Sequence, residues 1–291
     1  MKNPQARHTA TGKGSHFRWS RFAALARVDF AERWRIYAAV LLIALVVQLL
    51  LHGWAQFVLG KMRPMDVSTQ QGWYNVFLCI FGIPFMFVLH APMYKQGSGL
   101  LMLMRPASTF EKWLHAALLM LVAFPLAYTV VYLLATVPLN GFVAMLESAN
   151  HAKARLITPN AITSQSAGFH VYLPFLRADD RSQIDASSQW MFQWFYTVIA
   201  GFGAFALVRF RHAAPFKTLA LAFILLILSL FVLSLSMFTD GETGALTHWI
   251  DGSRRVDLNA STIVSNLLFW LGTPALVWWS AYLALRERDL T

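Results

Sequence analysis

Six long stretches of this chain contain no Asp, Glu, Lys or Arg, and each is about as long as a membrane core is thick. A helix needs roughly 20 apolar residues to cross a hydrocarbon layer of about 30 Å. Hydrocarbon offers no hydrogen-bond partner, so the backbone of such a stretch bonds within itself, and stretches without strand-like alternation form helices. The sequence therefore predicts an all-α membrane protein with six transmembrane helices, at residues 36–59, 73–94, 113–137, 189–208, 218–238 and 262–285.

Composition supports the membrane class. Charged residues make up 13% of the chain, against about 25% in soluble domains, and the mean hydropathy is +0.50. The one cysteine, Cys79, lies inside the predicted second span. A single thiol excludes an internal disulfide and a CxxC metal or redox site.

The distribution of positive charge predicts the orientation. Of the 24 Lys and Arg residues, 16 precede the first span, follow the sixth, or lie in the second-to-third and fourth-to-fifth connections. By the positive-inside rule both termini face the cytoplasm. The net charge of +10 is therefore a topology signal, and we expect no nucleic-acid partner. Residues 1–16 are predicted to be a disordered polar tail and 286–291 a cytoplasmic tail, with external loops at 138–188 and 239–261.

Residues 17–35 carry an amphipathic pattern before the first span. Aromatic residues at helical spacing form one face, and charged residues such as Asp29 lie mostly on the opposite face. We expect a separate helix in the membrane interface, with its aromatic face among acyl chains and its arginines at anionic lipid headgroups. A cytoplasmic helix packed on protein is the alternative. The aromatic residues are Trp19, Phe22, Phe30 and Trp34.

The connection between the second and third spans contains a short apolar segment followed by a helix start. Ser108 and Glu111, three residues apart before an apolar run, predict a capping box. The segment before Pro106 is apolar and rich in methionine, which suits a partner's groove because methionine adapts to irregular surfaces; the alternative is that it dips into the interface. The candidate contact residues are Leu100, Leu101, Met102, Leu103, Met104 and Arg105.

Two features missing from the sequence limit which energy source a transporter of this kind could use. Ion-driven transporters usually keep ionisable groups inside their spans, because such groups are costly there. The six predicted spans contain no carboxylate, lysine or arginine, which argues against proton or sodium coupling. No GxxxxGK[ST] sequence occurs, so the chain is not expected to hydrolyse ATP by itself.

In the connection between the second and third spans, Pro106-Ala107-Ser108 and Glu111-Lys112 match a pattern that recurs in the permease subunits of type-2 ABC exporters. Together with the six predicted spans and the N-terminal helix, this match makes the chain resemble such a permease subunit. The resemblance implies a coupling helix at 100–104, an N-terminal elbow helix, an ATP-binding cassette ATPase subunit beneath, and a second permease copy or sister permease. It implies a non-catalytic chain, without cofactor, in a bacterial inner membrane. Arg105 departs from the family, where leucine is more frequent, so the coupling helix would sit differently on its partner.

Two other function classes remain open at this stage. His90 and His115 lie near the cytoplasmic ends of two spans and would allow a haem-binding or quinone-handling subunit. A membrane anchor without transport is the third class. The GxGxxA sequence that begins at Gly201 lies inside a span and indicates close helix packing, not dinucleotide binding. Mid-span prolines predict three kinked helices, at Pro84, Pro125 and Pro274.

Overall fold

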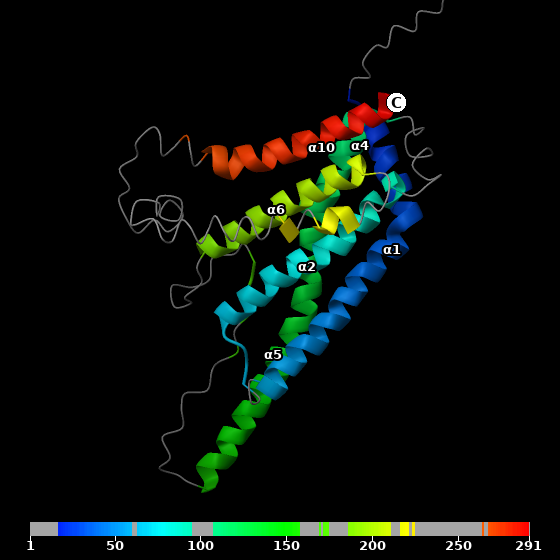
Figure 1. The fold of residues 1–291 in the computed structure, drawn as a ribbon. Coiled ribbons are helices and arrows are strands. Elements are labelled where there is room, and N and C mark those ends of the chain that lie inside the picture. Colours follow the sequence, from blue (N-terminus) through cyan, green and yellow to red (C-terminus); the bar gives the residue numbers. More distant parts are fainter. Residues whose placement is uncertain are drawn as a thin grey trace, which may run out of the picture.

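The computed structural model describes residues 17–59, 63–94, 107–157, 169, 171–174, 186–210, 216–220, 223–224, 264 and 267–290. These residues contain helices and no strand (Figure 1). The helices are α1 (Trp19–Trp54), α2 (Val67–Tyr94), α4 (Thr109–Leu118), α5 (Phe124–Ile157), α6 (Ala186–Arg209) and α10 (Thr273–Leu290). Three π-helical turns join or extend them: η1 (Ala55–Leu59), η2 (Leu119–Ala123) and η3 (Leu268–Gly272).

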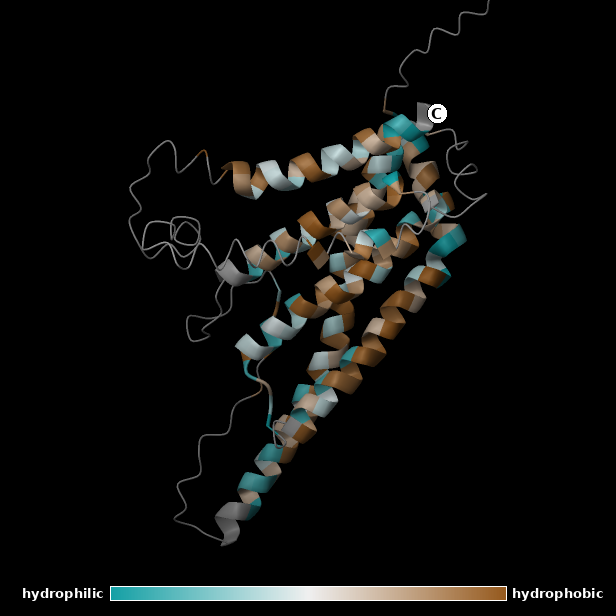
Figure 2. Cartoon of the chain, in the orientation of Figure 1, coloured by the Kyte–Doolittle hydropathy of each residue, from teal (hydrophilic) through white to brown (hydrophobic). Residues whose placement is uncertain are grey.

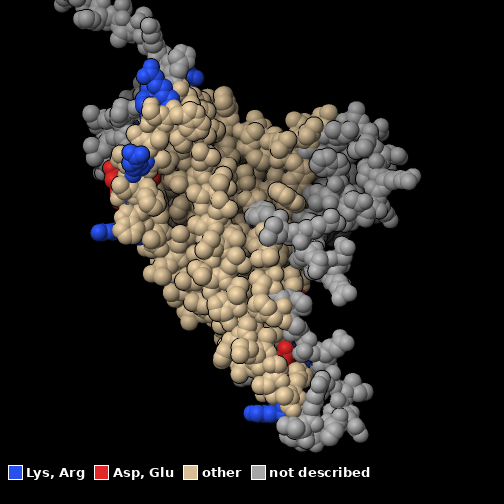
Figure 3. Space-filling view, turned by 180° about the vertical axis from the view of Figure 1, so that it is seen from behind, with Lys and Arg blue, Asp and Glu red and all other residues tan. Residues whose placement is uncertain are grey.

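Five helical segments in the described part of the chain are long and apolar enough to cross a membrane. Hydrophobic residues cover their middle portions, and polar residues gather at their ends (Figure 2). On the face shown in Figure 3, a wide zone without charged side chains separates the charges at the two ends. The prediction of an all-helical chain with several helices apolar enough to span a membrane is thus confirmed for the described residues, and the number of six spans stays a prediction. The segments are Trp19–Val58, Val67–Met93, Thr109–Lys153, Gln189–Arg209 and Leu268–Arg288.

α6 and α10 run in the same direction. Trp194, early in α6, donates a hydrogen bond to the carbonyl of Phe269 (3.1 Å), while Arg209 at its end pairs with Glu287 (3.2 Å). The chain between residues 210 and 267 must therefore return from one end of the bundle to the other. A sixth span at 218–238 would make this return, but most of it lies outside the described residues and remains a prediction. The predicted tail 1–16 and the loop 239–261 also lie outside them.

The predicted topology can be tested with reporters. A reporter fused after Ser166 is expected to be external and one fused after His212 to be cytoplasmic, because positive charge is concentrated on the side of the membrane that holds His212. The readout is a phosphatase active outside combined with a fluorescent protein that folds inside. Both fusions reporting the same side would rule out six spans with this orientation.

The first helix runs without a break from Trp19 to Trp54. The predicted boundary at residue 35, between an elbow helix and a span, is absent. The physical reason is local, because no glycine or proline lies between Trp19 and His52 to interrupt the hydrogen-bond ladder. Its first turns still expose the predicted aromatic face, and Trp19, Phe30 and Trp34 are exposed. Phe22 is half-buried and packs against the ring of His115 (centroids 6.1 Å apart).

Part of the predicted external loop 138–188 is helical. α5 continues through Pro138 to Ile157, beyond the predicted end of this span at residue 137. Asn140 and Val143 are fully buried, so tertiary packing holds the helix beyond the proline. Tyr172 also returns to the bundle, and its backbone amide donates to Gln70 (2.9 Å).

Asp66 begins α2. Its carboxylate accepts hydrogen bonds from the backbone amide and the hydroxyl of Thr69 (3.1 and 2.6 Å) and from the hydroxyl of Ser68. Burial raises the pKa of this carboxyl, but these hydrogen bonds outweigh burial and hold the pKa below its usual value. The ionised carboxylate therefore caps the helix at neutral pH, and the contribution is lost as the pH falls through the lowered pKa.

Two of the predicted proline sites coincide with π-helical turns. Pro125 and Pro274 follow η2 and η3 by two residues. In π-helical spacing their missing N–H groups would serve the carbonyls of Met120 and Phe269. Side chains of α6 supply the replacements: the Tyr196 hydroxyl donates to Met120 (2.6 Å), and Trp194 donates to Phe269. The prolines are accommodated because α6 satisfies the carbonyls they leave free.

Glycines let α6 approach its neighbours closely, as the GxGxxA spacing predicted. A Cβ added at Gly201 would lie 2.9 Å from the indole nitrogen of Trp278 in α10. At Gly203 it would lie 1.8 Å from the sulfur of Met86 in α2. Trp278 in turn donates to the carbonyl of Thr197 in α6 (3.1 Å). Small residues and indole hydrogen bonds together hold α6 against α2 and α10.

Candidate functional site

The start of α4 is anchored by the carboxylate of Glu111, which is fully buried. The amide of Ser108 donates to Glu111 Oε2 (2.8 Å), and the amide of Glu111 donates to the Ser108 hydroxyl (3.2 Å). These are the two halves of the predicted capping box, which is confirmed. The candidate contact segment Leu100–Arg105 directly precedes this cap and lies outside the described residues.

Glu111 also joins α4 to the first helix. Its Oε1 atom accepts from the backbone amide of Arg18 (2.9 Å) and from the guanidinium of Arg21 (3.1 Å). One carboxylate thus binds the N-terminal ends of two helices that are about 90 residues apart in the sequence. These bonds tie the start of α4 to the start of α1, because charge-assisted hydrogen bonds are short and strong.

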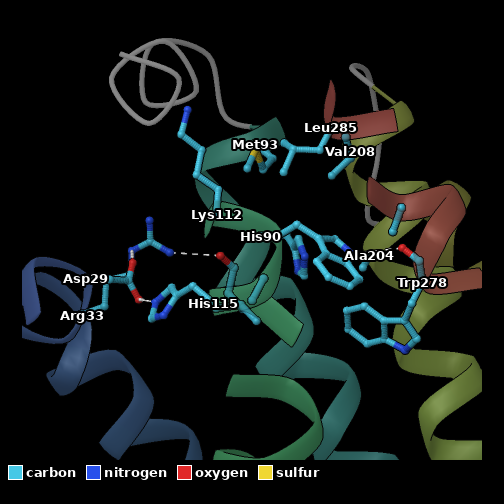
Figure 4. Close-up of a pocket in the computed structure, with 14 residues that line it drawn as sticks. Asp29, Arg33, His90, Met93, Lys112, His115, Ala204, Val208, Trp278 and Leu285 are labelled. Carbon is cyan, nitrogen blue, oxygen red and sulfur yellow. Dashed lines mark hydrogen bonds and ion pairs between the residues drawn. The ribbon is translucent and has the colours of Figure 1, made fainter. Parts of the chain in front are cut away.

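A buried ionic cluster lies beyond this junction, between α1 and α4 (Figure 4). Asp29 is 3% exposed and pairs with Arg33 one turn later (3.3 Å). His115 lies 3.2 Å from Asp29 Oδ2. A carboxylate only accepts, so the Nε2 atom of His115 carries the proton. Tyr37 completes the set and donates its hydroxyl proton to the same oxygen (2.8 Å).

The cluster reaches α2 through Arg33, which donates to the carbonyl of Leu89 (3.0 Å). Asp29 therefore lies at a contact of three helices. The expectation that the charged face of residues 17–35 meets lipid headgroups is wrong for Asp29. In the structure the aromatic face of α1 points outward and the face with Asp29 points into the protein. A buried charge keeps its ionised form only with such partners.

A small cavity of about 30 Å³ adjoins the cluster. Asp29, Arg33, His90, Lys112 and His115 contribute to its lining, and Figure 4 shows His90 next to the apolar wall that Trp278 and Ala204 form. A water molecule needs roughly 10–15 Å³ by this measure, so the cavity has room for about two. It is far smaller than a porphyrin.

The two histidines of the haem alternative line the same cavity, and each makes a hydrogen bond with one of its ring nitrogens. The Nδ1 atom of His90 donates to the carbonyl of Met86 (3.0 Å), and His115 is held by Asp29. These hydrogen bonds use Nε2 of His115 and Nδ1 of His90, so the other nitrogen of each ring could still ligate a metal, and it is the small volume of the cavity that leaves no room for a haem there. Within the described ranges no three His, Cys, Asp or Glu residues gather in a way that could hold a metal ion. The geometry gives the haem alternative little support.

Sequence reasoning missed Asp29, Arg33 and Lys112 as buried residues. One signal was present: the aromatic face of residues 17–35 was expected to meet lipid, which leaves the opposite face for protein. Lys112 was recognised only as part of the Glu111-Lys112 pattern, although it is buried beside the cavity. The partner of Asp29 was not predictable, because His115 lies 86 residues away.

Comparison with protein-family models, curated proteins and solved structures finds no match to this chain.

Proposed function

We propose that this chain is the permease subunit of an ATP-driven ABC exporter in a bacterial inner membrane. It would work with a second permease, identical or sister, and with two ATP-binding cassette subunits. The observation that carries the proposal is the junction at Glu111. The sequence that resembles the coupling region of type-2 exporters leads directly into a cap that holds both α1 and α4.

The junction gives a mechanical role to the segment before it. When the ATPase subunits close on ATP, they would push on residues 100–104. The displacement would pass through Ser108 and Glu111 into α4 and, through Arg18 and Arg21, into α1. Two helices of one permease would then move together, and a path would open between the two permease halves.

An apolar or amphipathic substrate fits this chain best. Large apolar side chains are exposed along the middle of α1 and α5, among them Leu42, Leu50, Leu126 and Leu134. These surfaces suit acyl chains or a second permease, and they present no charge that would bind an ion.

The test is the substitution Leu101→Glu. If this residue enters an ATPase groove, the unpaired carboxylate is expected to cost on the order of 2 kcal/mol, a roughly 30-fold loss of affinity. The tagged chain is purified from its native host in mild detergent. Copurified protein with Walker sequences is quantified by mass spectrometry, and vanadate-sensitive ATP hydrolysis is measured in liposomes.

Phe216→Glu is the matched control. Phe216 is 81% exposed in the other cytoplasmic connection, so the same change of charge is expected to leave both readouts unaltered. Equal copurification and hydrolysis for Leu101→Glu and the unmodified chain, at equal expression, would refute the coupling role of residues 100–104.

A further inference from the structure

A row of buried polar side chains lies between α1 and α5, far from the ionic cluster. Both helices contribute residues at four-residue intervals, so that each set lies on one helix face. Each of these residues is at most 1% exposed. We call this set the polar seam. It consists of Gln48, His52 and Gln56 from α1 and η1, and Tyr128, Tyr132, Thr136 and Asn140 from α5.

The seam is closed by direct hydrogen bonds at its two ends. The Gln48 side-chain amide donates to the Tyr128 hydroxyl (2.6 Å), and the Gln56 side-chain amide donates to the carbonyl oxygen of the Asn140 side chain. Between these two contacts, His52 lies next to Tyr132, with ring centroids 6.2 Å apart. The middle of the seam therefore has polar groups on both sides and no direct bond between His52 and α5.

Several buried atoms of the seam have no hydrogen-bond partner: Gln48 Oε1, His52 Nε2, Gln56 Oε1, Asn140 Nδ2 and the hydroxyl oxygens of Tyr132 and Thr136. The Nδ1 atom of His52 lies 3.0 Å from the carbonyl of Gln48. A carbonyl only accepts, so Nδ1 carries the proton and Nε2 of the neutral ring is an acceptor. The unpaired set thus contains three acceptors, one amide donor and two hydroxyls, which can donate or accept, in a region where unpaired polar groups are costly.

The chemistry of these atoms specifies a ligand. The three acceptors outnumber the two unpaired hydroxyls of the seam, and the amide of Asn140 requires an acceptor; hydroxyl groups of a ligand can donate and accept. No Asp, Glu, Lys or Arg occurs in residues 36–59, 67–94 or 113–146, so a charged group would be buried without a counter-charge. Aromatic rings border the seam, with Trp73 5.2 Å from the ring of His52.

We infer that the polar seam binds the uncharged, hydroxyl-rich headgroup of an amphipathic substrate. The inference rests on the proposed export function, because it specifies the polar part of the transported molecule. The outward faces of α1 and α5 carry exposed apolar side chains such as Leu50 and Leu134, so an acyl chain can remain in lipid while its headgroup enters the seam. Tyr172, from the external connection, packs on Tyr132 (centroids 6.4 Å apart) and covers the outer side.

The experiment uses a photoreactive octyl glucoside and the purified full chain in phosphatidylcholine nanodiscs. Saturable labelling of residues in α1 or α5 is expected, with competition by unlabelled octyl glucoside. An octyl phosphocholine has the same chain length but no hydrogen-bond donor, so it is expected to compete at least about tenfold less well. Labelled residues are identified by peptide mass spectrometry.

Two variants test the named atoms. Gln56→Met keeps the length of the side chain and removes its polar atoms, and His52→Phe keeps a ring; each is expected to weaken labelling about tenfold. The matched control is Gln189→Leu. Gln189 is also buried with an unpaired amide, but it lies at the start of α6, and its replacement is expected to leave labelling unchanged. Monodisperse chromatography of each variant confirms folding.

Three outcomes would overturn the inference: labelling that does not saturate, equal competition by the phosphocholine, or labelling that survives Gln56→Met in folded protein. Each would mean that the unpaired atoms of the seam do not bind a hydroxyl-rich headgroup. Because no ATPase is present in this assay, failure here leaves the exporter proposal standing. Conversely, loss of the exporter proposal through Leu101→Glu would leave a measured glucoside site intact.

Discussion

Replacement of Asp29 by Ala is expected to lower the free energy of unfolding by about 3–5 kcal/mol. The carboxylate accepts from Tyr37 and His115 and pairs with Arg33. Its removal leaves the guanidinium of Arg33 buried without its counter-charge, which costs more than the pair itself contributes. Reversible unfolding in mixed detergent micelles, followed by tryptophan fluorescence, measures the change.

Glu32→Ala is the control for this prediction. Glu32 lies on the same helix but is exposed, and its loss is expected to change the free energy of unfolding by at most about 0.5 kcal/mol. Asp29→Asn retains an acceptor for Tyr37 and removes the charge, so an intermediate loss is expected. Similar losses for Asp29→Ala and Glu32→Ala would show that the buried cluster does not stabilise the contact between α1 and α4.

Glu111→Ala is expected to be the second large loss, about 2–4 kcal/mol. It removes the acceptor of the Ser108 amide, the Arg18 amide and the Arg21 guanidinium together. Ser108→Ala removes one acceptor only and is expected to cost about 1 kcal/mol. The same unfolding measurement applies to both variants.

The pair of variants also separates stability from coupling. If Glu111 transmits displacement from the coupling segment, Glu111→Ala is expected to reduce substrate-stimulated ATP hydrolysis more than it reduces copurification of the ATPase. Ser108→Ala keeps the contacts of Glu111 with Arg18 and Arg21, so its hydrolysis is expected to stay near that of the unmodified chain. An equal loss of hydrolysis in both variants would contradict transmission through Glu111.

Local features of this chain were predictable from its sequence. The capping box needs only Ser108 and Glu111, which are three residues apart, and no distant partner. The close approach of α6 followed from glycines at Gly201 and Gly203, because a missing side chain permits close contact whichever helix lies opposite. The predicted helix boundary at residue 35 is also wrong for a local reason. The hydrophobic pattern changes there, but no glycine or proline interrupts the helix.

Positions that depend on distant partners were not predictable. The four-residue spacing of Gln48, His52 and Gln56 is visible in the sequence, as is that of Tyr128, Tyr132, Thr136 and Asn140. The sequence does not show that the two sets face each other. Asp29 was assigned to the membrane surface for the same reason, because its burial depends on His115 in another helix.

The sequence alone determined that this chain forms long apolar helices and where most of them lie, because a stretch without charge must satisfy its backbone internally in hydrocarbon. It also determined the start of α4, through a cap that acts within one turn. Only the tertiary structure shows that Asp29 in the first helix is buried, that Glu111 joins two helix ends, and that two polar rows meet in the seam. These depend on which helix faces meet, and that is set by packing among residues about 80 to 90 positions apart.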